Sequence, residues 1–119
     1  MTGRDLYNKA CEMLGYNNAE EISGNDVMLK RALTLANMVY SDLWQGFKRG
    51  EDFKPLTVLT DKLDLPNKVL QDIAPYGMAM FLAQSESDAD NQNLYASLYN
   101  QKRTRVVKVQ GKHLPPIFG

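Results

Sequence analysis

None of the potentially catalytic side chains in this 119-residue sequence stands in a convincing catalytic motif. His113 is the only histidine, beside a Leu-Pro-Pro sequence, and Cys11 is the only cysteine. Nucleophilic catalysis requires a base within hydrogen-bond reach of the nucleophile, and no known motif provides that pair here. We expect His113 to be solvated or packed and Cys11 to be a small, semi-buried hydrophobic residue. The sequence therefore predicts a protein that is not an enzyme.

Residues 86–91 are acidic enough to suggest a cation site. An EF-hand loop counted from Asp88 would need glycine at its sixth position and glutamate at its twelfth, where Asn93 and Tyr99 stand. Carboxylates also cap helix N-termini, because they accept hydrogen bonds from the free backbone N–H groups. We interpret the cluster as a helix cap and predict no metal site. No glycine-rich phosphate-binding motif is present, so no cofactor is expected.

A basic patch is predicted near the end of the last helix, formed by Lys102, Arg103, Arg105 and Lys108. These cations can bind phosphates or an acidic protein surface, and Tyr99 and Tyr95 lie one and two turns earlier, where they can stack on bases. The alternative is a solvated helix end, where cations are favourable, with both tyrosines packed in a core or interface. The formal net charge of zero argues against nucleic-acid binding over the whole surface and leaves a local patch open.

The composition is typical of one globular domain, with 44% hydrophobic and 24% charged residues. A single cysteine cannot form an internal disulfide, which favours a reducing compartment. Residues 1–5 lack the apolar core of a signal peptide. We therefore expect a protein of a soluble, reducing compartment.

The spacing of apolar residues predicts an all-α protein with four helices, over residues 4–14, 26–47, 75–86 and 89–107. A short helical turn is expected in residues 67–73. The first helix has Thr2 and Asp5 in a capping-box pattern and Gly15 after its end. The second has the clearest apolar stripe, formed by Leu29, Leu33, Ala36, Tyr40, Leu43 and Phe47.

Residues 73–84 form the longest nearly uncharged, apolar run of the sequence. A helix that is apolar on every side is normally buried on every side, so we expect this one at the centre of the core. Gly77, Ala79 and Ala83 are small and allow neighbouring helices to approach closely. The run is too short to span a membrane.

Two segments do not fit a helix. Residues 48–66 contain Pro55 and several residues that favour extended backbone, and connectors of this length are often functional or mobile. Residues 110–119 contain Gly111 and two prolines and cannot continue a helix. We predict a small four-helix bundle in residues 1–109, from which a long extended arm over 48–66 projects, followed by an extended C-terminal tail.

The order of motifs is similar to that of a known family. Ala-Pro-Tyr-Gly-Met-Ala-Met-Phe-Leu-Ala-Gln-Ser-Glu (residues 74–86) is followed by Asp-Ala-Asp-Asn (88–91) and by Leu-Tyr-Ala-Ser-Leu-Tyr-Asn-Gln-Lys-Arg (94–103). The segment from Phe-Lys-Pro-Leu-Thr (53–57) to Leu65-Pro66 precedes them. Over residues 25–105 the chain resembles small bacteriophage head–tail connector (adaptor) proteins found in prophages of Gram-positive bacteria.

This resemblance implies a structural role. Such adaptors are α-helical and form a ring, typically twelve-fold, beneath the portal protein, where they extend the DNA channel and offer a surface to the next connector or tail-completion protein. The arm would then contact neighbouring subunits or the portal, through Phe53, Leu56, Val58 and Leu59. DNA would pass through the channel without sequence recognition. The protein would assemble in the host bacterial cytoplasm, remain in the virion and have no membrane partner.

Two other functions stay open from the sequence. The chain resembles the adaptors in packing motifs, which another small helical phage protein, such as a tail-completion or capsid-assembly factor, would also satisfy. A DNA-binding helical module that uses the basic patch belongs to a different class. It predicts affinity for duplex DNA that falls steeply with salt.

Overall fold

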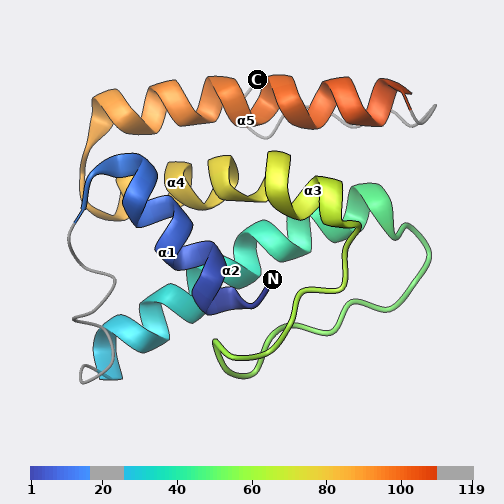
Figure 1. Cartoon of the computed structure of the whole chain (residues 1–119), viewed down its shortest axis with the longest axis horizontal. Helices are drawn as coiled ribbons and strands as arrows, with labels where there is room; N and C mark the ends of the chain where they lie inside the picture. Colours follow the sequence, from blue (N-terminus) through green and yellow to red (C-terminus); the bar gives the residue numbers. More distant parts are fainter. Residues whose placement is uncertain (17–25, 110–119) are drawn as a thin grey trace.

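Figure 1 shows a computed structural model of the chain, in which residues 1–16 and 26–109 are described. The helices are α1 (Gly3–Leu14), α2 (Asp26–Phe47), α3 (Asn67–Asp72), α4 (Ala74–Ser85) and α5 (Ala89–Val109). The described residues contain no strand, only one isolated antiparallel bridge between Thr2 and Lys62. The all-α prediction is therefore confirmed for this part of the chain. The predicted tail over 110–119 lies outside the described residues.

The helices form a flat body in which α4 is central (Figure 1). Helix α5 lies along one long side and runs antiparallel to α4. Helices α1 and α2 cover the other side of α4 at inclined angles, and α3 leads directly into α4. The helix bounds agree with the predicted ones to within two residues, because periodicity and capping residues fix both. Among the described residues, no helix is long and apolar enough to cross a membrane.

Helix α4 is buried on all sides, as its composition predicts. Every residue from 77 to 83 is buried, and so are Ala74 and Pro75. The absence of a side chain at Gly77 lets the ring of Tyr99 on α5 lie directly against the α4 backbone. A Cβ atom at Gly77 would lie 2.7 Å from Cε1 of that ring. The predicted close approach of a neighbouring helix at Gly77 is therefore confirmed.

The ends of α1 are fixed by its own sequence. Asp5 N–H donates to Oγ1 of Thr2 at 3.1 Å, and Thr2 N–H donates to Oδ2 of Asp5 at 3.0 Å, which completes the capping box. The hydrogen bond from the Thr2 backbone lowers the pKa of Asp5. Gly15 ends the helix with φ +75°, a left-handed conformation that glycine adopts without strain.

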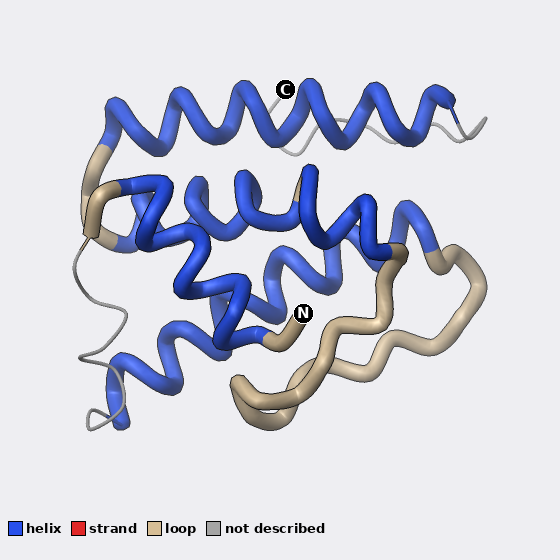
Figure 2. Tube along the Cα trace, viewed as in Figure 1, coloured by secondary structure: helices blue, strands red, loops and turns tan. Residues whose placement is uncertain are grey.

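The segment 48–66 does not project from the body, and this prediction was wrong. Figure 2 shows it as a long loop that returns past the start of α1. Its leucines are all buried in the core: Leu56, Leu59, Leu63 and Leu65. Backbone hydrogen bonds also hold it, because Arg4 N–H donates to Leu59 O at 2.8 Å and Leu63 N–H donates to Met1 O at 3.0 Å. The segment forms one wall of the domain, because removing its leucine side chains from water is favourable in free energy.

Candidate functional site

The predicted basic patch is divided by the fold. Arg103 points into the protein, where only 4% of the residue is exposed. Its Nε lies 2.8 Å from Oδ2 of Asp42 on α2, and its Nη2 donates to Oδ1 of the same carboxylate at 3.0 Å. Arg103 lies four residues after the buried Tyr99 and therefore on the same face of α5. Its inclusion in a surface patch was wrong.

The other three cations of the patch have different surroundings. Lys102 is half-buried, and its Nζ lies 4.5 Å from the centre of the Tyr76 ring, within cation–π range. Arg105 is exposed beside a shallow hollow that it forms with Asn100 and other residues of α5. The side chain of Lys108 lies outside the described residues. The described side chains thus leave no continuous basic surface on this helix.

Asp42 connects α2 and α5 and is a residue that the sequence did not single out. It accepts from the hydroxyl of Tyr99 at 2.6 Å in addition to its contacts with Arg103. Burial, followed by the charge of Asp42, raises the pKa of Tyr99 well above its usual value. Tyr99 therefore stays a neutral donor, and the carboxylate is matched by one cation and one hydroxyl. We assign this cluster a structural role in fixing the register of the two helices.

The four arm residues predicted to contact neighbours occupy different environments. Leu56 and Leu59 are core residues, as described above. Phe53 is half-buried and packs edge-on against Tyr40, with ring centres 5.1 Å apart. Val58 is 51% exposed and is the one of the four whose side chain is open to a partner. The prediction of surface contacts was wrong for the two leucines, because both belong to the core cluster and pack against Gly3 at the start of α1.

Hydrogen bonds hold Val58 in place at the turn of the loop. The carboxylate of Asp61 accepts from the N–H groups of Thr57 and Val58, at 2.9 and 3.2 Å, and from the Thr57 hydroxyl at 2.8 Å. These bonds, led by that from the Thr57 backbone, lower the pKa of Asp61. Just before the turn, the Asn37 side chain of α2 donates to Leu56 O and accepts from Leu56 N–H. These hydrogen bonds therefore fix the backbone of the turn that presents Val58 at the surface.

This turn and the first half of α2 enclose a hollow of about 290 Å³, which we call the α2–loop hollow. Leu29, Leu33, Val58 and Leu59 give it an apolar lining, and Lys30 and Arg4 are its charged lining residues. Leu29 and Leu33 belong to the predicted core-facing stripe, and both pack against the core while remaining only half-buried. The amphipathic pattern of α2 did not predict this incomplete burial. An apolar stripe shows which face of a helix points to the core, but not which of its residues another element covers.

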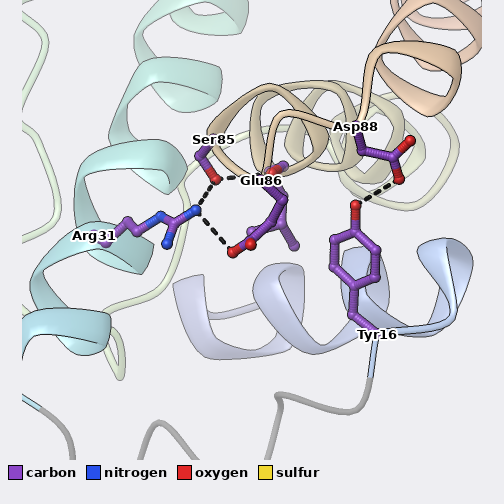
Figure 3. Close-up of polar contacts among 6 residues, drawn as sticks. Tyr16, Arg31, Ser85, Glu86 and Asp88 are labelled. Atoms are coloured by element: carbon purple, nitrogen blue, oxygen red, sulfur yellow. Dashed lines mark hydrogen bonds and ion pairs between the residues drawn. The ribbon is translucent and has the colours of Figure 1, made fainter.

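The acidic segment between α4 and α5 is held by several polar contacts. Figure 3 shows those of Glu86 with Arg31 and of Asp88 with Tyr16. Oδ1 of Asp88 accepts from Asn91 N–H at 3.4 Å, the N-cap arrangement, and its Oδ2 accepts from the Tyr16 hydroxyl at 2.7 Å. The Asn91 side chain is the main cause of the lowered pKa of Asp88. Glu86 pairs with Arg31 of α2 at 2.8 Å. The predicted helix cap is confirmed, and the described residues contain no cluster of three or more metal-ligating side chains.

Cys11 is fully buried, and burial raises the pKa of its thiol, which disfavours the nucleophilic thiolate. The prediction that Cys11 is a small hydrophobic residue is consistent with this position, although it is more buried than expected. His113 lies outside the described residues.

No family model, curated protein or solved structure matches this chain.

Proposed function

We propose that this chain is a structural head–tail adaptor of a bacteriophage or prophage. It would form a ring beneath the portal, extend the DNA channel and meet the next head–tail or tail-completion protein. The observation that carries the proposal is the order of the motifs over residues 74–103, described above. In the fold these residues form one antiparallel pair, α4 and α5, joined by the acidic turn.

The packing of this pair supports a scaffold role. Helix α4 is buried from Ala74 to Ala83 except at Tyr76, and α5 is fixed to α2 by the contacts of Arg103 and Tyr99 with Asp42. A subunit of a ring must transmit contacts from one neighbour to the next without deforming, and close-packed interiors have that low compressibility. The exposed Val58 on the hydrogen-bonded turn is the candidate contact with a neighbouring subunit or the portal.

The DNA-binding alternative is less well supported by the same geometry. A phosphate-binding patch needs cations with exposed head groups, and Arg103 is engaged by Asp42 inside the protein. Lys102 lies over the ring of Tyr76, which leaves Arg105 as the exposed cation among the described side chains of the patch. A ring adaptor needs only that DNA passes through its channel, without sequence recognition.

Co-sedimentation with purified portal rings from the same phage or prophage tests the proposal. We expect the chain to sediment with the portal at physiological salt, with or without nuclease treatment. Absence of binding to an intact portal would contradict the proposal and favour a protein of the tail side. Retention on duplex DNA that falls steeply with salt and disappears in a Lys102→Glu, Arg105→Glu variant would favour the DNA-binding module instead.

A further inference from the structure

The α2–loop hollow is a largely apolar surface that the described residues leave open. Val58 is half exposed there, and Leu29 and Leu33 are only half-buried. Among the described residues, the charged side chains that line the hollow are the cations Lys30 and Arg4, with no carboxylate beside them. A matching partner would therefore present a small apolar projection with a carboxylate next to it.

The same chain carries such a projection on α5. Leu94 is 52% exposed, and Leu98, four residues later on the same face, is half-buried. Asp90 lies four residues before Leu94 and is exposed, so it adds a carboxylate at the end of this row. We call these three residues the α5 ridge.

The hollow and the ridge are on opposite sides of the molecule. Figure 1 shows α5 along one long side, whereas the first half of α2 and the turn of the loop lie along the other, with α4 and α1 between them. One copy therefore cannot join its own ridge to its own hollow. A contact between two different surfaces of successive copies is heterologous, and it generates a closed ring when the rotation between copies closes.

We propose that the α5 ridge of one copy docks in the α2–loop hollow of the next copy. Leu94 fills the apolar lining beside Val58, and Asp90 faces Lys30. This inference rests on the proposed ring function, because it names the contact by which the ring would form. It needs no residue of the buried Asp42 cluster and leaves that cluster intact.

Cross-linking between two cysteine variants tests the contact directly. Val58→Cys chains are mixed with Leu94→Cys chains and treated with a short bismaleimide. Val58→Cys mixed with Gln101→Cys is the matched control, because Gln101 is exposed on the same face of α5, two turns away. Unsubstituted chains report the background of the buried Cys11. Both replaced side chains are about half exposed, so the variants should retain the helical circular dichroism spectrum.

We expect the Val58→Cys and Leu94→Cys mixture to give a clear excess of cross-linked dimer over the Gln101 control. Lys30→Glu in the Val58→Cys chain should lower the yield about fivefold, since a surface charge pair is worth up to about 1 kcal/mol. Adding Asp90→Lys to the Leu94→Cys chain should restore the yield of cross-linked dimer. Equal yields in mixture and control, or no restoration by the charge exchange, would overturn the proposed contact.

Portal binding separates this inference from the proposed function. Val58→Asp and Leu94→Asp should each prevent a complete ring on the portal. A complete ring formed by both variants would overturn the docking of the ridge and keep the adaptor function. A specific cross-link in a protein that does not bind the portal would keep the docking and overturn the adaptor function.

Discussion

The buried contact between α2 and α5 allows a quantitative prediction from one substitution, Asp42→Asn. This change keeps the shape of the side chain and removes its charge. The Arg103 side chain is 5% exposed, so its charge cannot be compensated by water. Removal of one partner of a buried ion pair costs about 3–5 kcal/mol of unfolding free energy. Asp42 keeps 20% of its side chain exposed, and asparagine can still accept one hydrogen bond, so we expect about 3 kcal/mol.

Urea unfolding followed by circular dichroism measures this loss. The control is Glu86→Gln, which breaks the ion pair with Arg31, whose side chains are 39% and 38% exposed. An exposed pair contributes less than about 1 kcal/mol, so this control should be close to the unsubstituted protein. Equal small losses of unfolding free energy in the two variants would show that burial does not determine what an ion pair contributes in this protein.

A paired substitution checks the physical cause. Asp42→Leu with Arg103→Met replaces both charges by apolar side chains of similar size, which is often neutral or stabilising at a buried pair. The double variant should therefore be more stable than Asp42→Asn. If it is less stable than that single variant, the loss does not come from an unpaired buried charge.

Three further predictions concern packing and pH. Gly77→Ala should destabilise by about 1–3 kcal/mol, because the added Cβ meets the fixed ring of Tyr99, and an unchanged melting temperature would contradict this. Asn37→Ala should lower the unfolding free energy by about 1–3 kcal/mol, because the buried backbone groups of Leu56 lose both partners; a change below 0.5 kcal/mol, on the order of a neutral surface substitution, would contradict it. Asp61→Ala should be less stable than the unsubstituted chain at pH 7, and the difference should shrink in urea titrations as the pH falls below 3.8. The pKa of Asp61 is lower in the folded protein than its ordinary value of 3.8, so the ionised carboxylate stabilises the fold above pH 3.8. This stabilisation is lost as the pH falls and the folded protein takes up the proton. A stability difference that is constant with pH would contradict this prediction.

The helices were predictable because each carries its own local information. Thr2, Asp5 and Gly15 mark the ends of α1, and the uncharged composition of α4 indicates its burial. These features act within a few residues of each other, so the sequence alone reveals them. The close approach at Gly77 was predictable for the same reason, although its partner Tyr99 was not.

The placement of the loop 48–66 and of Arg103 depends on distant partners. Leu56 packs closely against Gly3 at the start of α1, where a Cβ would lie 2.9 Å from the Leu56 Cδ1. Arg103 is buried because Asp42, far away in the sequence, lies opposite it. A basic residue near a helix end normally remains solvated, and its spacing of four from Tyr99 was the one local indication of burial.

Electron microscopy of the chain mixed with portal rings from the same phage or prophage is the most direct test of the adaptor function. The adaptor function predicts an additional layer, coaxial with the portal and continuing its channel, with a symmetry expected to be twelve-fold. Portal rings that remain without this layer at saturating concentrations of folded protein would contradict it.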